Sequence, residues 1–189
     1  LRSGDNWIEN ITNSIDSKII GFEGSNITFN MLEQLKVRIN KQVEWKDFST
    51  PITLGRIIKS DSEVKLIEAA INISDTAFNK VEKQIKAGIT EKEISWEIEK
   101  TMRELGAESP SFDTIVASGT NGSKPHHSPT DKIVKEGEGI VIDMGAKYQG
   151  YCSDLTRTIF LGEPSNKFKE IYSIVLRSQM IVIETVKPN

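Results

Sequence analysis

An α+β fold, in which helices cover one face of an antiparallel sheet, is the class that this sequence of 189 residues predicts. The order of the hydrophobic patterns leads to it. Between residues 60 and 106, apolar residues recur at helical spacing, whereas between residues 113 and 162 they alternate at every second position. A final helical pattern starts near residue 165. Helical segments and alternating strands are thus grouped along the chain, which is typical of an α+β domain.

The first 50 residues follow a different pattern, in which helix and strand signals alternate as in an α/β domain. An amphipathic stretch around Trp7 and Ile11 precedes the apolar run KIIGF, the helical segment TFNMLEQLKVRI and the strand segment QVEW. The segment FSTPITLGRI then places a proline and a glycine between two periodic regions. We therefore expect a linker there, with a boundary near residue 52 that separates residues 1–52 from residues 53–189.

Two packed helices are expected after this linker. The first begins at Ser60 or Asp61, and its apolar face consists of Val64, Ile67, Ile71, Ser74, Phe78, Val81 and Ile85. The second begins after Thr90, because Glu93 stands three residues later and the two can form a capping box. Both helices would pack against the strand segments DTIVAS, GIVIDMGA and YCSDLTRTIFLG.

The composition excludes several classes of partner. The 24 Lys and Arg against 27 Asp and Glu give a net charge of −3, without the basic surface that nucleic-acid binding requires. No apolar run reaches the ~20 residues of a membrane span. The single Cys152 excludes an internal disulfide and a cysteine-built zinc site. We expect a cytoplasmic protein with no nucleic-acid and no membrane partner.

The two ends of the chain suggest a fragment. The sequence begins at Leu1 without an initiator methionine and stops at TVKPN directly after a long helical pattern. Because a helix exit of this kind leads into further structure, we expect a longer protein.

Asp143 and Asp154 are the most informative candidate site residues. Asp143 follows an apolar run and Asp154 precedes Leu155, so both carboxylates lie in segments that favour burial. A two-residue loop at Tyr148 and Gln149 would set them directly opposite each other, where like charges repel unless a divalent cation lies between them. A three-residue loop with a bulge would place them on opposite faces. The alternative is that each Asp faces solvent from a strand or from the end of a turn.

The loop NGSKPHHSPTD carries both histidines of the protein, His126 and His127. If this segment is extended, adjacent side chains point to opposite sides, so at most one histidine faces a given site. Pro125 and Pro129 favour a fixed loop, and rigid polar loops beside a sheet often carry function. The alternative is an exposed polar loop without a role. Cys152 is more typical of a small strand residue than of a nucleophile.

Three blocks make the sequence resemble a known family: RIIKSDSEVKLIEAA, PSFDTIVASGTNGSKPHHSPTD and GEGIVIDMGAKYQGYCSDLTRTIFLG. The stretch from Arg56 to Asn189 resembles the first half of the pita-bread metallopeptidases, in particular the Xaa-Pro aminopeptidases and Xaa-Pro dipeptidases (prolidases). Residues 1–52 resemble the end of the creatinase-like α/β domain that precedes the catalytic domain in these peptidases. The resemblance thus implies an incomplete pita-bread domain preceded by the tail of a small α/β domain.

The resemblance also implies site residues. The family holds two divalent metal ions between two Asp, one His and two Glu, and Asp143 and Asp154 match the two Asp positions. His126 matches a histidine that contacts substrate without binding metal, so it is the implied catalytic residue, whereas His127 matches no known role. No histidine follows His127 in the sequence, so the chain would carry half of the metal site.

The enzyme that the resemblance implies is a metal-dependent peptidase that removes the N-terminal residue before a proline, with the fragment alone inactive. Carboxylate ligands favour manganese, with magnesium, cobalt and zinc as alternatives. The implied partners are peptides with proline at the second position and, at full length, a second copy in a homodimer. Two alternatives are a non-catalytic pita-bread module that binds peptide or protein and a metal-free creatinase-like hydrolase. Either would be expected to have lost one or both aspartates.

Overall fold

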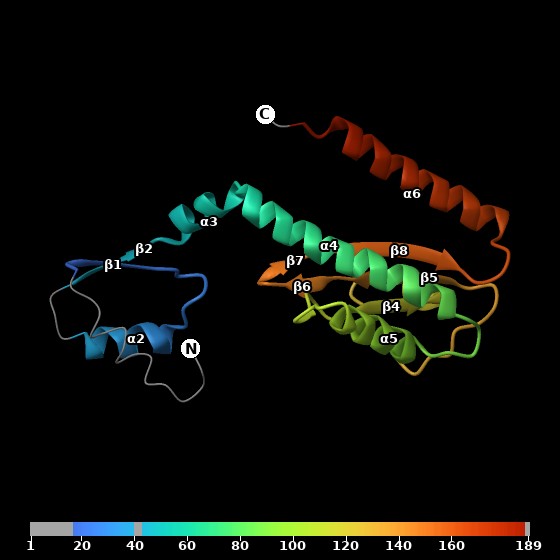
Figure 1. Ribbon diagram of the computed structural model, residues 1–189, viewed down its shortest axis with the longest axis horizontal. Helices are drawn as coiled ribbons and strands as arrows, with labels where there is room; N and C mark the ends of the chain where they lie inside the picture. The colour runs from blue at the N-terminus through green and yellow to red at the C-terminus, as the bar shows by residue number, and fades with distance from the viewer. Residues whose placement is uncertain (1–16, 40–42, 188–189) are drawn as a thin grey trace. The chain divides into compact units, whose positions relative to one another are not determined.

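The computed structural model describes residues 17–39 and 43–187, which fall into two compact units divided between Ser60 and Asp61 (Figure 1). The amphipathic stretch expected around Trp7 and Ile11 lies outside the described residues. The division comes later in the chain than the boundary expected near residue 52.

In residues 17–39 and 43–60, the first unit contains two parallel strands and two helices: β1 (Ile19–Phe22), α2 (Phe29–Arg38), β2 (Glu44–Asp47) and α3 (Ser49–Ile57). The strands and the helix expected from KIIGF, TFNMLEQLKVRI and QVEW are therefore confirmed. The segment expected to be a linker forms α3 instead. Pro51 is compatible with this helix because it lies in the first turn, where the missing amide hydrogen costs no helical bond. The division between units consequently falls after Ser60.

The second unit combines three longer helices with two small sheets. Its helices are α4 (Asp61–Val81), α5 (Glu91–Glu104) and α6 (Asn166–Thr185), with the short 3-10 helices η1 (Glu82–Gln84) and η2 (Gly119–Ser123). Its strands are β3 (Ser109–Pro110), β4 (Ile115–Ser118), β5 (Gly139–Met144), β6 (Ala146–Tyr148), β7 (Tyr151–Cys152) and β8 (Leu155–Phe160). They form two antiparallel sheets with the orders β4-β5-β8 and β3-β6-β7. The predicted α+β class is confirmed.

Helices α4 and α5 pack against the strands and share one hydrophobic core with them (Figure 1). In β5, Ile140, Ile142 and Met144 are fully buried in this core, whereas Val141 and Asp143 between them are half-buried. Successive strand residues point to opposite faces. One face of β5 therefore meets the helices, and Asp143 lies on the other.

The capping box predicted for α5 is present. The Thr90 hydroxyl accepts a hydrogen bond from the Glu93 amide at 3.2 Å, and the Glu93 carboxylate accepts one from the Thr90 amide at 2.8 Å. At the other end, Gly106 follows the helix with a φ of +104°, which suits glycine. Both ends of α5 are thus determined by local sequence.

The buried face of α4 is only partly the one predicted. Val64 and Ile71 are 42% and 43% exposed, while Ala70 and Ala77 are fully buried. Alanine has the smallest side chain that still favours a helix, so a face lined with alanines can lie close to its neighbours. That close face turns Val64 and Ile71 outward.

The structure adopts neither of the two loops considered for the aspartates. Asp143 pairs with Thr156 instead of Asp154, and the hairpin loop consists of Gln149 and Gly150, one residue later than expected. Gln149 and Gly150 have φ angles of 46° and 82°, and the type I′ turn requires positive φ at both loop positions. Glycine adopts this conformation without strain, so the turn centres on Gly150. Asp154 consequently lies one residue before β8, outside the strand pairing.

Each of the two long predicted strands is divided in two, at the point where Gly145 lies close to Ser111 and Ser153. Ser111 bridges them: its amide donates to the Gly145 carbonyl at 2.9 Å, and its hydroxyl donates to the Ser153 carbonyl at 2.8 Å. A Cβ on Gly145 would lie 2.0 Å from Ser111 Oγ and 2.1 Å from the Ser153 carbonyl oxygen. This close contact therefore requires glycine at position 145. Asp154 lies beside it, at the junction between β7 and β8.

Gly145→Ala is expected to destabilise the protein. The added methyl group would overlap the Ser153 carbonyl oxygen, which cannot move without losing its hydrogen bond from Ser111. The free energy of unfolding should therefore fall by about 3 kcal/mol, at the upper end for overpacking. Urea denaturation measures the change. Gly122→Ala is the control, because its Cβ would lie 3.6 Å from the nearest atom, in ordinary contact. Equal stability of the two variants would contradict the close contact of Gly145 with Ser111 and Ser153.

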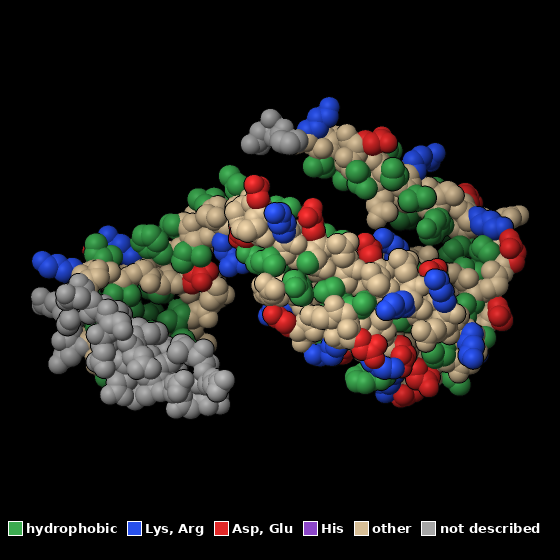
Figure 2. Space-filling model, in the orientation of Figure 1, with side chains coloured by type: hydrophobic (Ala, Val, Ile, Leu, Met, Phe, Trp, Pro, Cys, Tyr) green, Lys and Arg blue, Asp and Glu red, His purple; other side chains and the backbone are tan. Residues whose placement is uncertain are grey.

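Helix α6 carries many apolar side chains on its surface, visible in green in Figure 2. In its first turn, Phe168 packs against Phe160 of β8, with ring centroids 4.7 Å apart. Further along, the exposed apolar residues are Ile171, Ile174, Val175, Leu176, Met180, Ile181, Val182 and Ile183. Among the helices in the described part of the chain, none is both long and apolar enough to cross a membrane. The contact between Phe168 and Phe160 anchors the beginning of α6 to the sheet.

Candidate functional site

The aspartates and the histidine singled out from the sequence line one cavity. Asp143, Asp154 and His126 border a space of about 420 Å³, and its wall also includes Phe112, Asp113 and Ile115. Asp143 reaches it from the face of β5 that the helices do not cover. Residues up to 28 positions apart in the sequence are thereby brought to one place, which is what a shared site requires.

The two aspartates reach the cavity by different routes. Asp143 is half-buried within β5, and the Thr156 hydroxyl donates a hydrogen bond to Asp143 Oδ1 at 2.8 Å. This contact follows from the register, because residues paired on antiparallel strands lie on the same face. Asp154 is exposed at the strand junction instead of lying within a strand. The two carboxylates therefore share a cavity without being opposite each other.

The two histidines occupy a turn and not an extended segment. The His127 amide donates to the Lys124 carbonyl at 3.3 Å, which makes Lys124 to His127 a β-turn with Pro125 at its second position. His126 is the third residue of this turn and is exposed, whereas His127 is buried. Both histidines nevertheless line the cavity, so the expectation that at most one of them faces a given site is wrong, because it assumed an extended segment and the segment is a turn.

Glu91, in the first turn of α5, is a fully buried carboxylate that the sequence reasoning missed. Three groups donate to Oε1: the Ser118 amide at 2.8 Å, the Ser118 hydroxyl at 2.8 Å and Asn121 Nδ2 at 3.0 Å. Three donate to Oε2: His127 Nε2 at 2.9 Å, the Thr130 amide at 3.1 Å and the Thr130 hydroxyl at 2.8 Å. A carboxylate only accepts, so His127 carries a hydrogen on Nε2. The available signal was the position of Glu91 directly after the cap, where an acidic side chain is favoured.

These contacts keep Glu91 ionised. Burial by itself would raise the pKa of Glu91, but the hydrogen bonds from His127, Asn121 and Ser118 outweigh it and hold the pKa well below its usual range. Lys132 Nζ donates to Ser118 Oγ at 2.7 Å and forms an ion pair with Glu138 Oε2 at 2.8 Å.

Glu91→Gln is expected to destabilise the protein at neutral pH more than in acid. The variant leaves buried donors without an acceptor, which should lower the free energy of unfolding at pH 7 by about 3 kcal/mol. Because the folded pKa is depressed, the contribution of Glu91 is complete above the unfolded pKa of about 4.3 and is lost as the pH falls through the folded pKa. The difference from the unsubstituted protein should therefore shrink below about pH 4. Denaturation at several pH values measures it, and a constant difference would contradict the ionised state.

The donor chemistry of the cavity fits a hard divalent cation in part. Asp143 and Asp154 offer carboxylate oxygens, the ligands that manganese and magnesium prefer. Within residues 17–39 and 43–187, no group of three or more His, Cys, Asp or Glu side chains converges as a metal site. The described residues thus supply two candidate ligands and not a complete set.

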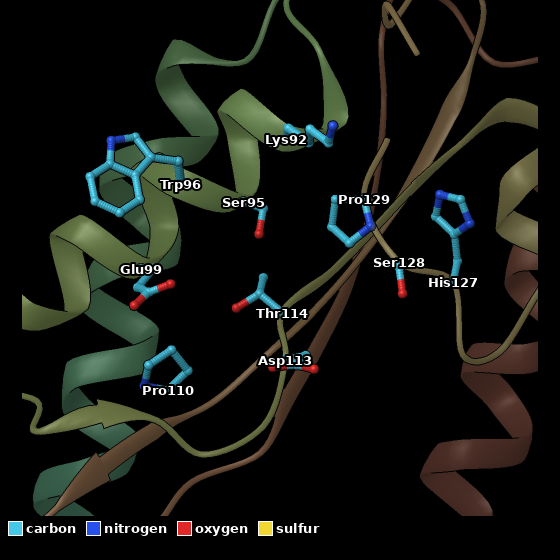
Figure 3. A pocket seen from close by; sticks show the side chains of 10 residues that line it. All are labelled: Lys92, Ser95, Trp96, Glu99, Pro110, Asp113, Thr114, His127, Ser128 and Pro129. Carbon is cyan, nitrogen blue, oxygen red and sulfur yellow. The ribbon is translucent and has the colours of Figure 1, made fainter. Parts of the chain in front are cut away.

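A second hollow of about 370 Å³ is lined by residues of the histidine loop and of α5 (Figure 3). Figure 3 shows Trp96 and Glu99 of α5 on one side, Ser128 and Pro129 on the other, and Thr114 between them. His127 and Ser128 line both this hollow and the cavity of the aspartates. Asp113 lines both spaces as well, so the two spaces are adjacent and share part of the histidine loop.

Proteins of known sequence and structure resemble this chain closely. It is 43% identical over 171 residues to a Xaa-Pro dipeptidase of Pyrococcus horikoshii, an alignment that covers 90% of this chain and 48% of the relative. A crystal structure of the prolidase from Pyrococcus horikoshii superposes with a TM-score of 0.87 at 40% identity, over 97% of this chain and 52% of the other. The X-Pro aminopeptidase from Thermotoga maritima gives a TM-score of 0.85 at 38% identity, over 95% and 51%. The chain spans about half the length of these relatives.

The family assignment follows from a match that covers most of the second unit. The model of metallopeptidase family M24 matches residues 65–189, which include the histidine loop and both aspartates. The match agrees with the fold expected from the resemblance, because the similar structures are prolidases and an aminopeptidase that this chain covers for half their length. The chain belongs to metallopeptidase family M24.

Proposed function

We propose that the longer protein containing this chain is a metal-dependent peptidase that removes the N-terminal residue preceding a proline. One observation above all supports this proposal: Asp143, Asp154 and His126 line a single cavity in a chain of a metallopeptidase family. The names of the similar proteins, Xaa-Pro dipeptidase and X-Pro aminopeptidase, support a proline at the second position of the substrate. The 189-residue chain alone would carry half of the metal site and be inactive.

The residues of the cavity have distinct proposed roles. Asp143 and Asp154 would hold divalent metal ions, with manganese as the proposed metal. Metal ions bound there supply an activated water molecule and polarise the scissile carbonyl. Thr156 orients one of the carboxylates, since its hydroxyl donates to Asp143 Oδ1. His126 would donate a hydrogen bond to the carbonyl oxygen of the scissile bond as negative charge develops there.

Peptide hydrolysis by the longer protein tests the proposal. The protein is stripped of metal, reloaded with manganese and offered Gly-Pro, Gly-Pro-Ala and the matched control Gly-Ala. Cleavage of Gly-Pro or Gly-Pro-Ala, but not of Gly-Ala, is the expected result, and the better of the two substrates separates a dipeptidase from an aminopeptidase. Hydrolysis without metal would favour a creatinase-like enzyme. Peptide binding without hydrolysis under any metal would favour a non-catalytic binding module.

The proposal extends to the location and assembly of the protein. We propose a cytoplasmic enzyme, in keeping with its single cysteine, and a homodimer at full length, as the family resemblance implies. Light scattering during size-exclusion chromatography of the longer protein measures the assembly directly. A monomer at micromolar concentration would contradict the dimer.

A further inference from the structure

One buried side chain holds the histidine loop at both of its ends. The loop runs from Ser118 at the end of β4 to Thr130, and Glu91 accepts hydrogen bonds from both of these residues. Between them, Glu91 also accepts from Asn121 and from His127. Helix α5 is part of the hydrophobic core, so the loop is tied to a rigid element.

These bonds restrict the position of His126 although none involves its side chain. His126 is the third residue of the turn from Lys124 to His127, and the fourth residue is held by Glu91. The start of the same turn is held too, because the Lys124 amide donates to the Asn121 carbonyl at 2.9 Å, and the Asn121 side chain donates to Glu91. With both sides of the turn fixed, His126 is left on its exposed corner, beside Asp143 and Asp154.

Burying the ionised Glu91 carboxylate costs more free energy than a purely structural contact would justify. Burying an ionised carboxylate costs several kcal/mol unless hydrogen bonds replace its water, and an apolar side chain of similar size would often stabilise a core as well. Glu91 is fully buried and its six hydrogen bonds all go to residues of one loop. What such a network supplies beyond stability is one defined geometry for that loop.

We propose that Glu91, acting through His127 and the loop of residues 118–130, is a positioning residue that directs His126 toward the cavity of Asp143 and Asp154. This inference rests on the proposed function, in which His126 donates a hydrogen bond to the scissile carbonyl oxygen. Displacement of a catalytic group by about 1 Å can reduce a rate by about 100-fold even when the substitution is remote from the chemistry.

The first test compares Glu91→Gln with Glu93→Gln in the longer, metal-loaded protein. Glu93 is the matched control, since it lies in the same turn of α5 and its carboxylate bonds to Thr90 and not to the loop. For Glu91→Gln we expect kcat on Gly-Pro to fall by about 10- to 100-fold, with KM and metal content nearly unchanged. For Glu93→Gln we expect no change in kcat. A Glu91→Gln enzyme with unchanged kcat would overturn the inference.

A second pair of variants keeps the test valid if Glu91→Gln fails to fold. The amide nitrogen of a glutamine can take the place of His127 Nε2, the atom that contacts Glu91, whereas leucine offers no donor. We therefore expect His127→Gln to retain kcat and His127→Leu to lose it. Equal kcat values for these two variants would contradict the positioning role.

Two further readouts separate this inference from the proposed function. If Glu91 acts through His126, then Glu91→Gln should cause no further loss of kcat in a protein that already carries His126→Ala. Independently of activity, amide hydrogen exchange in residues 118–130 should become at least about tenfold faster in Glu91→Gln, while exchange in α4 stays unchanged. Unchanged exchange in the loop would overturn the inference whether or not the protein is a peptidase. Absence of Gly-Pro hydrolysis by the unsubstituted protein would count against the proposed function alone.

Discussion

Asp154→Asn is expected to remove metal and activity together from the longer protein. The amide that replaces the carboxylate is a weaker ligand and carries no charge to balance a divalent cation. Substitution of a residue that only hydrogen-bonds to a metal ligand typically lowers metal affinity or activity by about 10- to 100-fold. Loss of a ligand itself should therefore lower metal affinity and kcat by at least about 100-fold. Metal analysis of the purified variant, beside steady-state hydrolysis of Gly-Pro, measures both quantities.

Asp113→Asn is the matched control for this prediction. Asp113 lines the same cavity and is exposed like Asp154, but the family resemblance gives it no ligand role. Asp113→Asn should therefore keep its metal content. Asp154→Asn with full metal content and full activity would refute the ligand assignment, and equal metal loss in both variants would indicate a general effect of charge on the cavity.

His126→Ala is expected to keep metal and lose turnover. The histidine is proposed to meet the developing oxyanion, and one such donor contributes about 2.7 to 4 kcal/mol, or about 10²- to 10³-fold in kcat. KM should change little, because the hydrogen bond strengthens as the reaction proceeds. Kinetics on Gly-Pro and metal analysis of the same preparation check both parts.

The contrast between the two variants carries the assignment of roles. His126 is exposed on the corner of a turn, so its truncation should leave the fold and the Glu91 network intact. Thermal unfolding verifies that point. Metal loss in His126→Ala would make the histidine a ligand, and an unchanged rate would remove it from the mechanism.

Local signals in the sequence determined several elements correctly. Thr90 and Glu93 form the capping box of α5 because both partners lie within one helical turn. The period-two pattern of GIVIDMGA predicted the strand β5, since strand periodicity is a property of the backbone. Such interactions involve residues that are close in sequence, which is why they can be read without a structure.

The position of Asp154 shows where sequence reasoning stopped. A loop at Tyr148 and Gln149, one of two alternatives, would have set Asp154 opposite Asp143, but the loop lies one residue later and the two carboxylates meet only at the cavity. The turn had to supply positive φ at both positions, and Gly145 had to fit closely against Ser111 and Ser153. The second requirement depends on Ser111, which lies 42 residues from Ser153. No local pattern expresses such a contact.

The histidine loop and Glu91 also show which features the sequence reveals and which only the fold reveals. The sequence by itself determined that a proline-bounded loop carries both histidines and that helices and antiparallel strands form an α+β domain. Only the tertiary structure decided which histidine is buried, because the partner of His127 is Glu91, 36 residues away. A buried carboxylate is stable only where several donors converge on it. That convergence exists only after the chain has folded, so the sequence alone does not reveal it.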